Sequence, residues 1–491
     1  MRAIKIKLTN ELQPTWALCP KCLGRGRVRL RIRKKVKLSY QAALLHFEQH
    51  GGTAPEQPQA PLSNCPHCHG SGLIAAAHPP EADTENYPKV AIVGGGIGGV
   101  ALAVACLHRG IPFTLYERDR DFSARSQGYG LTLQQASKAI AGLGIVSLDQ
   151  GVVSTRHVVH NTDGTIVGEW GMRKWLDAGA THAPKRTNVH IARQSLRLAL
   201  LEQLDAHPQL HEAVKWGHQL VNLHETATGV ELSFAVEGEI KTAQADLVVG
   251  ADGIRSAVRN LALGQDANSL RYLDCIAILG ICPLSALSDV ESDLLDSATV
   301  FQTANGHERI YVMPFSADSV MWQLSFPMTE SEAQALSAQG AEALKAEACQ
   351  RTQWHAPIPQ VLAATPAALV SGYPVYDRAV LSAEALANIG PVTLLGDAAH
   401  PMSPFKGQGA NQALLDALSL ARIIVRGCRL KPSWRELGLR ERVLEEFEAE
   451  MLERSAIKVQ DSADAAEFLH SEVVLHESDE PRGHCLRKPG H

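Results

Sequence analysis

The pattern of apolar and polar residues in the central part of the chain predicts short buried strands that alternate with helices. An apolar run at residues 90–93 leads into the glycine-rich stretch 94–99, and residues 100–108 then have the composition of a helix. A second apolar run, residues 113–116, ends at Glu117, about 20 residues beyond the glycines. A strand, a glycine turn, a helix and a strand ending in an acid indicate a unit that binds a dinucleotide.

Each glycine of the G-x-G-x-x-G pattern in this unit has its own physical role. Gly94 permits the tight turn, Gly96 lets backbone N–H groups approach a pyrophosphate, and Gly99 lets the helix pack close to the strand. The Glu117 carboxylate can accept hydrogen bonds from ribose hydroxyls and would repel a 2′-phosphate, so FAD or NAD is expected rather than NADP. Residues 90–107 carry no charge, but the five glycines in their middle argue against a transmembrane helix.

A later segment favours a flavin over NAD. Apolar residues 393–395 predict a strand that Gly396 and Asp397 end, and a loop with two prolines leads to residues 407–412, where another helix begins. The start of such a helix offers unpaired N–H groups and a partial positive charge to the negative charge of a reduced flavin. The Asp397 carboxylate can accept hydrogen bonds from the hydroxyls of a ribityl chain.

A third segment, residues 246–255, contains Asp252 and Gly253 after another apolar run. With this segment, the chain resembles the group A flavoprotein monooxygenases, the family of para-hydroxybenzoate hydroxylase and the tetracycline-inactivating monooxygenases. The resemblance covers about residues 88–430, and the stretch 396–409 is most similar to the tetracycline-modifying branch. It implies an α/β fold in which a Rossmann-like FAD-binding domain is interleaved with a substrate domain built on a mixed or antiparallel sheet.

The chemistry that this resemblance implies belongs mostly to the cofactor. NAD(P)H would bind transiently and reduce FAD, and the reduced flavin would react with O₂ to a C4a-hydroperoxide that hydroxylates a small, electron-rich substrate. No side chain is assigned a catalytic role, and His400 is expected to pack in its loop. The residues expected to contact FAD are Gly94, Gly96, Gly99, Glu117, Arg118, Arg125, Arg193, Asp252, Gly253, Asp397, Pro404, Gly407, Gly409, Ala410 and Asn411.

The substrate is expected to contact a sheet formed by the chain between the segment 246–255 and the segment that begins at residue 393. Residues 298–301, 309–314 and 320–326 alternate or run apolar between turn signals, which predicts antiparallel strands. Met321 stands where the tetracycline-modifying members lead us to expect a substrate-binding histidine, which weakens that assignment. The apolar character of these strands favours a neutral aromatic or polyketide-like compound.

The first 80 residues contain two copies of the pattern C-x-x-C-x-G-x-G. The pairs Cys19/Cys22 and Cys65/Cys68 each predict a thiolate knuckle, and two knuckles complete a tetrahedral zinc site. The glycines leave N–H groups free to bond the sulfurs. The repeat resembles the cysteine-rich zinc domain of J-protein co-chaperones, which has four copies. Disulfides and redox Cys-x-x-Cys chemistry are the alternatives.

Between the knuckles, basic residues occupy every odd position from 25 to 37, which predicts a strand with one cationic face. Residues 1–80 carry a net charge of +9 and the remainder of the chain −14. We therefore expect the module to dock on the acidic surface of its own chain or on an acidic partner. Aromatic residues for base stacking are scarce there, so nucleic acid is an unlikely partner.

The 491 residues are long enough for several domains. No apolar stretch typical of a signal peptide or a membrane anchor is found in residues 1–10, so we expect a reducing cytoplasm. The expected division is a Cys₄ module at 1–80, a linker at 81–87, an FAD-binding domain at 88–155, 190–265 and 385–430, a substrate domain at 156–189 and 266–384, a helical region at 431–475 and a disordered tail at 476–491.

Two other classes of function stay open at this point. One is a flavin oxidoreductase that does not transfer oxygen, and the other is a zinc-bearing binding protein whose flavin domain acts as a sensor. The substrate, the choice between NADH and NADPH, and the oligomeric state do not follow from the sequence.

Overall fold

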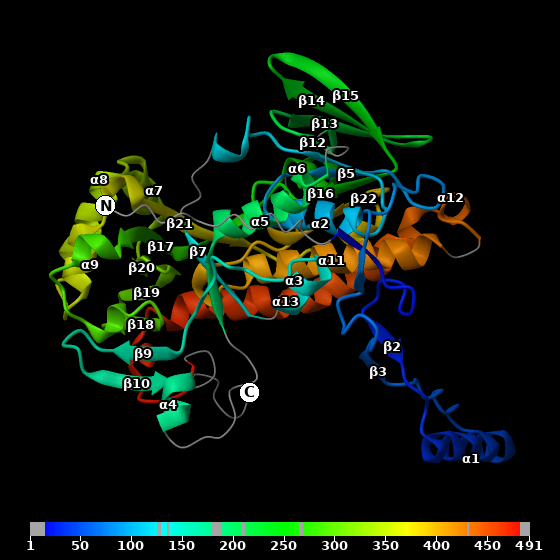
Figure 1. The fold of residues 1–491 in the computed structure, drawn as a ribbon, viewed down its shortest axis with the longest axis horizontal. Helices are drawn as coiled ribbons and strands as arrows, with labels where there is room; N and C mark the ends of the chain where they lie inside the picture. Colours follow the sequence, from blue (N-terminus) through cyan, green and yellow to red (C-terminus); the bar gives the residue numbers. More distant parts are fainter. Residues whose placement is uncertain are drawn as a thin grey trace.

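The computed structural model describes residues 15–124, 129–134, 137–177, 188–207, 212–264, 269–429 and 432–481. Two sheets form the body of the molecule, and a small N-terminal module projects from it (Figure 1). Among the described residues, none of the helices combines the length and the apolar character needed to cross a bilayer.

The first sheet is parallel and contains the apolar runs that the sequence pattern singled out. Its strands are, in spatial order, β12 (Val214–Lys215), β6 (Phe113–Tyr116), β5 (Val90–Val93), β16 (Leu247–Gly250) and β22 (Val392–Leu394). β5 and β16 are buried along their whole length, as is usual for parallel strands covered on both faces. Because β5, β16 and β22 run parallel, their carboxyl ends meet at one edge of the sheet.

Three helices pack around this sheet. They are α2 (Ile97–Leu107), α5 (Arg193–Asp205) and α11 (Gly409–Cys428). α2 contacts both α5 and α11, and all its residues except Gly98 are buried. This burial explains why α2 is apolar on every face. The helix therefore fills the centre of the body instead of spanning a membrane.

The second sheet has seven strands. In spatial order they are β10 (Ile166–Trp170), β9 (Arg156–His160), β18 (Thr299–Ala304), β19 (Arg309–Ser316), β20 (Ser319–Pro327), β17 (Leu270–Pro283) and β21 (Val370–Arg378). Only β9 and β18 pair in parallel, so the sheet is mixed. The predicted antiparallel strands between residues 298 and 326 are confirmed as β18, β19 and β20. Helices α7 (Glu330–Ala338), α8 (Ala341–Arg351) and α9 (Ile358–Ala364) cover its outer end (Figure 1).

Smaller elements join and extend the two sheets. A three-stranded sheet consists of β7 (Gly130–Leu133), β11 (Val189–Ala192) and β8 (Val152–Val153), and a meander consists of β13 (Gln219–Thr226), β14 (Gly229–Val236) and β15 (Glu239–Ala245). Short helices are α3 (Ser137–Gly142), α4 (Met172–Asp177), α6 (Ala257–Leu263), α10 (Ala383–Ala387) and α12 (Trp434–Leu437). The predicted α/β fold, with a Rossmann-like part and a mixed sheet, is confirmed.

The predicted C-terminal helix packs back on the body. A π-helical turn at Arg440–Leu444 continues into α13 (Glu445–Phe468), and Leu444, Phe447, Met451 and Leu452, which recur at helical spacing, are buried. The chain then reaches β10, where the Ser478 N–H donates to the Val167 carbonyl and Lys174 forms an ion pair with Asp479 at 2.6 Å. These contacts correct the prediction of disorder for residues 476–481. The rest of the predicted tail lies outside the described residues.

The N-terminal module is built from two small pairs of strands. β1 (Thr15–Leu18) pairs with β4 (Leu73–Ala76), β2 (Arg27–Arg29) pairs with β3 (Leu62–Asn64), and α1 (Lys34–His50) lies between β2 and β3 in the chain. α1 has no buried residue and lies apart from the body, beyond β2 and β3 (Figure 1).

The prediction of a cationic strand over residues 25–37 is wrong for most of its length. Only Arg27–Arg29 forms a strand, and the helix α1 begins at Lys34. The alternation of basic and apolar residues suggested a period of two, but Lys, Ala, Leu, Gln and Glu dominate from residue 34 onward. These residue types have high intrinsic helix propensity, and no strand pairs with the basic segment beyond residue 29 to override it.

The predicted linker, residues 81–87, is held against the body. The Trp434 indole N–H donates to the Asn86 carbonyl at 2.9 Å, and Arg435 donates to the carbonyls of Glu85 and Thr84 at 2.5 and 2.9 Å. Tyr87 is fully buried. The module is thus connected to the body by a fixed segment.

Candidate active site and cysteine cluster

A cavity of about 690 Å³ opens where the carboxyl ends of the parallel strands face the second sheet. Residues from all three segments line it, together with residues of the mixed sheet. The predicted flavin contacts that line this cavity are Gly96, Arg193, Gly253, Asp397, Pro404, Gly407, Gly409 and Ala410. Residues that are more than 300 positions apart in the sequence therefore share one cavity.

The first glycine loop has the geometry that its sequence predicts. Gly94 has φ +109°, a conformation that favours glycine, and a Cβ at Gly99 would clash with the carbonyl oxygen of Gly94. Gly96 differs from both, because its backbone angles (φ −73°, ψ −175°) suit any residue and a Cβ there would meet no atom within 4 Å. Gly96 therefore leaves open space at the start of α2, where a phosphate group can approach the helix N-terminus.

Glu117 lies beside this loop. Its carboxylate accepts hydrogen bonds from the backbone N–H groups of Gly95 at 2.6 Å and Asp119 at 2.9 Å, and the residue is buried. A carboxylate has about four acceptor positions, so two bonds leave capacity for ribose hydroxyls. The structure thus fixes Glu117 next to the glycine loop, as the dinucleotide-binding pattern requires.

Arg197 supports the same loop from α5, although the sequence had not singled it out. Its Nε donates to the Gly95 carbonyl at 2.6 Å, and its guanidinium lies 5.1 Å from the Phe122 ring and 5.5 Å from the Trp216 ring. The signal was present in the sequence, because Arg197 follows Arg193 by four residues and so shares its face of the helix.

Arg193 reaches the cavity from the start of α5. Its Nη1 donates to the Tyr129 hydroxyl at 2.5 Å, and its guanidinium lies 5.3 Å from the ring centroid of Tyr129. Burial acts to lower the pKa of Arg193, but Tyr129, Asp397 and Tyr373 outweigh it and raise the pKa. Arg193 is therefore a permanent cation in the cavity wall. Burial raises the pKa of Tyr373, which stays a neutral phenol.

Asn411 holds the flavin-facing loops together. Its Oδ1 accepts from the Gln134 N–H at 2.9 Å, and its Nδ2 donates to the carbonyls of Thr132 and Gly407, both at 2.8 Å. The side chain thereby joins β7 to the loop before α11. Asn411 is not among the residues that line the cavity, so it lies behind the loop before α11. The expected contact of Asn411 with FAD stays a prediction.

His400 belongs to a buried chain of charges beneath the same loop. Its Nε2 lies 2.7 Å from Asp416 Oδ2, Asp416 Oδ1 lies 2.8 Å from Arg454 Nη2, and the Gly396 N–H donates to Asp416 at 2.9 Å. Burial acts to lower the pKa of His400, but the charge and hydrogen bond of Asp416 outweigh it and raise the pKa. The chain fixes the loop to α11 and α13, which agrees with the expected packing role of His400.

Asp252 and Gly253 have different surroundings. The Asp252 carboxylate accepts from the Ser256 hydroxyl at 2.5 Å and from the N–H groups of Ala257 and Val258 at 2.6 and 3.1 Å, so it caps α6. Gly253 lines the cavity. Of this pair, Gly253 therefore faces the expected cofactor, and a contact from Asp252 stays a prediction.

Two further arginines were expected near FAD. Arg118 follows Glu117 and is exposed to solvent. Arg125 lies outside the described residues. Arg118 is not among the residues that line the cavity, and both assignments stay predictions.

The mixed sheet forms the apolar wall of the cavity. Leu279, Met321 and Gln323 line it, and Met321 Sδ lies 3.0 Å from the backbone nitrogen of Gly130. The apolar cluster behind this wall contains Leu279, Val300, Met313, Met321, Tyr129, Ile281, Tyr311, Phe315 and Tyr373. Gln323 and the tyrosines supply the polar groups of this wall. Tyr129 and Tyr373 had no sequence signal, because they come from a loop and from a distant strand.

Comparison with known proteins agrees with this geometry. The family described as "FAD binding domain" matches residues 87–429. The chain belongs to this FAD binding domain family.

Relatives within the family are monooxygenases. The chain is 27% identical to 3-amino-4-hydroxybenzoate 2-monooxygenase PtmB3 of Streptomyces platensis over 352 residues, which cover 70% of this chain and 80% of that protein. It is 30% identical to the aurachin C monooxygenase/isomerase of Stigmatella aurantiaca over 341 residues, which cover 68% of this chain and 80% of that protein. The prediction of an FAD-dependent monooxygenase is thereby confirmed.

A solved structure has the same fold. Klebsiella pneumoniae HpxO, crystallised with FAD and uric acid, superimposes with a TM-score of 0.62 at 21% identity and covers 78% of this chain and 88% of that chain. The FAD binding domain match begins at residue 87, so the N-terminal module lies outside it.

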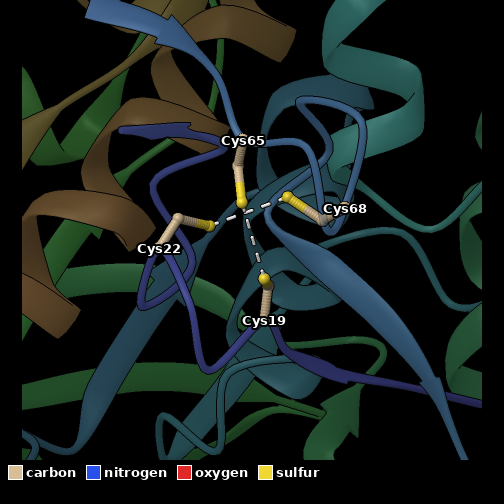
Figure 2. A group of neighbouring side chains, drawn as sticks. All are labelled: Cys19, Cys22, Cys65 and Cys68. Carbon is tan, nitrogen blue, oxygen red and sulfur yellow. Dashed lines mark hydrogen bonds between the residues drawn. The ribbon is translucent and has the colours of Figure 1, made fainter. Parts of the chain in front are cut away.

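Four cysteines converge in that module (Figure 2). The Sγ atoms of Cys19, Cys22, Cys65 and Cys68 all lie within 4.8 Å of one another, and the four residues are buried. The Sγ atoms of Cys19 and Cys65 are 4.0 Å apart and those of Cys22 and Cys68 are 3.7 Å apart. Tetrahedral zinc with Zn–S bonds of about 2.3 Å separates sulfurs by about 3.8 Å. The donor set and its spacing therefore fit zinc.

The surroundings of the sulfurs also match a zinc knuckle. The Gly26 N–H donates to Cys22 Sγ at 3.3 Å and the Gly72 N–H donates to Cys68 Sγ at 3.2 Å. The predicted bonds from the glycine N–H groups to sulfur are thus confirmed. His67 Nδ1 lies 3.3 Å from Cys19 Sγ and is a neighbour of the cluster.

Proposed function

We propose that this FAD-dependent monooxygenase uses NAD(P)H and O₂ to hydroxylate a small aromatic or polyketide-like compound in the cavity between the two sheets. The observation that carries the proposal is that the glycine loop of α2, the Gly253 segment and the loop before α11 line the same cavity as Leu279, Met321 and Gln323. One surface suits a cofactor and the opposite surface suits an organic substrate.

The assignment of FAD contacts follows from this arrangement. Gly96 leaves open space at the N-terminus of α2 for the pyrophosphate, with Glu117 beside it for the ribose. Asp397 lines the cavity together with the N-terminus of α11, and we assign its carboxylate the role of accepting hydrogen bonds from the ribityl chain. The partial positive charge of that helix end supports the negative charge of the reduced ring. Bound FAD would supply electron transfer from NAD(P)H and the activation of O₂.

The protein itself contributes position and environment. The apolar wall around Leu279 and Met321 excludes water and holds a substrate ring by apolar contact. Gln323 and the tyrosine hydroxyls fix its orientation by hydrogen bonds. Arg193 stays charged and is placed to stabilise negative charge on the substrate or the cofactor as the reaction proceeds.

The names of the relatives support a ring substrate. PtmB3 is named for an aminohydroxybenzoate, and the solved HpxO structure holds uric acid. Among the residues described as lining the cavity, two have basic side chains, Arg193 and Arg255. The large apolar cluster behind the wall favours a compound whose surface is mostly apolar.

We also propose that the cysteine cluster holds one structural zinc ion. Four buried thiols at these separations leave no open coordination position, which is typical of a structural site. The described cysteines are free thiols, which supports a reducing compartment such as the cytoplasm. We further propose the expected division into a module at 1–80 and interleaved FAD and substrate domains, with residues 476–481 packed on the substrate domain.

The test of the function is oxygen transfer. Purified protein is supplied with FAD, NADPH or NADH and a panel of phenols, hydroxybenzoates and polyketide-like aromatics under ¹⁸O₂. We expect substrate-dependent NAD(P)H oxidation and one ¹⁸O atom in the product. Substrate oxidation with no ¹⁸O in any product would identify a flavin oxidoreductase and overturn the proposal.

A further inference from the structure

Two arginines of the body lie against the cysteine cluster without a carboxylate partner in the described part of the chain. Arg109 lies two residues after the last residue of α2, and Arg422 lies on α11. The fourteen described ion pairs of lysine or arginine with carboxylates include neither of them. A buried cation is costly unless an opposite charge accompanies it. The cysteine cluster can supply this negative charge if its sulfurs are thiolates.

Arg109 is only 2% exposed. Its Nη1 donates to the Ala105 carbonyl at 3.0 Å and its Nη2 to the Gly142 carbonyl at 3.4 Å, while its buried Nε has no hydrogen-bond partner. A Cβ at Gly24, in the first knuckle, would lie 4.0 Å from this Nε. The unpartnered side of the guanidinium thus faces the knuckle.

Arg422 approaches the cluster from the other helix. Its Nη2 donates to the carbonyl of Ser71, in the second knuckle, at 2.9 Å, and its buried Nε has no hydrogen-bond partner. A Cβ at Gly26, whose N–H bonds Cys22, would lie 3.0 Å from Arg422 Nη2. Arg109 therefore faces the first knuckle, and Arg422 contacts both knuckles.

The contacts of the two knuckles differ from the expected docking on an acidic surface of the same chain, and docking on an acidic partner stays a prediction. The knuckles meet two cations, while the basic residues of α1 lie apart from the body (Figure 1). Four thiolates and one Zn²⁺ carry a net charge of −2, so the metal-bound cluster is an anion that can face two arginine cations. Two arginine charges balance it.

We propose that Arg109 and Arg422 are the counter-ions of a dianionic zinc tetrathiolate, and that this contact couples the metal state of the module to FAD binding. The inference rests on the proposed zinc site. The coupling follows from the helices involved: α2 and α11 pack together, and their N-terminal ends line the flavin cavity. When the metal leaves, both arginines lose their counter-charge, and the two helices lose a constraint that favours the flavin-binding arrangement. Because coupling between two binding sites is reciprocal, FAD should tighten zinc binding by the same factor.

The test compares Arg422→Met with Arg426→Met in the full-length protein. Arg426 lies one turn further along α11 and pairs with Glu446 on the surface, so it controls for loss of an arginine from this helix. Three quantities are measured: bound zinc per chain, the rate of zinc transfer to a coloured chelator, and the Kd of FAD from quenching of flavin fluorescence. Arg422→Lys keeps the charge and takes the place of Arg422→Met in the comparison if the methionine variant does not fold.

We expect one zinc per wild-type chain, zinc transfer at least tenfold faster in Arg422→Met, and a three- to tenfold weaker FAD Kd. Arg426→Met should match the wild type, and Arg422→Lys should lie between them. Treating the wild type with the chelator should weaken FAD binding by a similar factor, and added Zn²⁺ should restore it.

Equal zinc transfer and equal FAD affinity in Arg422→Met and the wild type would overturn the proposal. Wild-type protein without zinc would overturn both this inference and the zinc site. In either case, one FAD per chain and ¹⁸O in the product would leave the monooxygenase function intact, so the failures are distinguishable.

Discussion

The flavin cavity and the cysteine cluster lie in one chain but depend on different interactions. Around the cavity, backbone groups and glycines form the binding surface, and an extensive apolar core holds them in place. In the described part of the N-terminal module, the buried apolar cluster consists of the four cysteines with Val28 and Ile74 packed against it, and Leu73 is also buried. A module of this size buries too little apolar surface to fold on hydrophobic contacts alone. We therefore expect the module to depend on a bound metal for its folding, and the walls of the flavin cavity to depend mainly on the apolar core.

The largest effect should follow from removing two zinc ligands. Cys65→Ser combined with Cys68→Ser should abolish zinc binding and unfold the module, because structural zinc contributes about 10–16 kcal/mol in small zinc modules. The body keeps its own core and should retain most of its secondary structure. Zinc content and limited proteolysis measure the effect. Cys349→Ser, outside the cluster, should leave the zinc content unchanged, and a module that stays resistant to protease without zinc would contradict the comparison.

The second test fills the open space at Gly96. The backbone angles at position 96 are permitted for any residue and a Cβ there would meet no atom within 4 Å, so we expect Gly96→Val to fold. Its side chain would occupy the place of the pyrophosphate, and FAD affinity should fall at least 100-fold, about 2.7 kcal/mol. Fluorescence titration with FAD and thermal unfolding of the apoprotein measure the two effects. Unchanged FAD affinity would mean that the phosphates bind elsewhere.

A smaller loss is expected when the support of the glycine loop is removed. Arg197→Met deletes the hydrogen bond to the Gly95 carbonyl and the stacking on Phe122 and Trp216. FAD affinity should fall about tenfold, or roughly 1.4 kcal/mol. The same titration checks this result, with Arg120→Met as an exposed control from the adjacent loop. An effect as large as that of Gly96→Val would indicate direct contact with the cofactor.

The smallest effect concerns pH. The folded-state pKa of His400 is raised beyond its unfolded value of about 6.5, so its stabilising contribution is fully present below about pH 6.5 and is lost as pH rises through the folded pKa. The free energy of unfolding of the wild type should therefore exceed that of His400→Gln most at pH 6. The difference should shrink by on the order of 1 kcal/mol toward pH 9. Urea unfolding at several pH values measures it, and a difference that grows with pH would refute the assignment.

Much of the flavin region could be predicted because its signals are local. The turn at Gly94, the close contact at Gly99 and the acid at Glu117 each follow from neighbouring residues and recur in the structure. Tyr129 and Tyr373 could not be found in this way, because only tertiary packing brings them to the cavity. The role of Asp252 at the start of α6 depended on a helix boundary, and such boundaries are hard to place from sequence.

In the N-terminal module, less of the structure could be predicted from the sequence than in the flavin region. The convergence of its four cysteines could be predicted from spacing alone, because two equal Cys-x-x-Cys knuckles can complete one tetrahedral set of ligands. Its basic segment was misread as a strand, since helix propensity and the lack of a pairing strand decided the outcome. The contacts of Arg109 and Arg422 with the knuckles had no sequence signal, because the partners lie about 85 and 350 positions apart in the chain.

The most direct test of the account is the flavin content of the full-length protein after purification and incubation with FAD. We predict one non-covalent FAD per chain by absorbance, and its loss from Gly96→Val protein that is otherwise folded. Wild-type protein that stays colourless and does not bind added FAD would contradict the convergence of the three segments on a single cofactor.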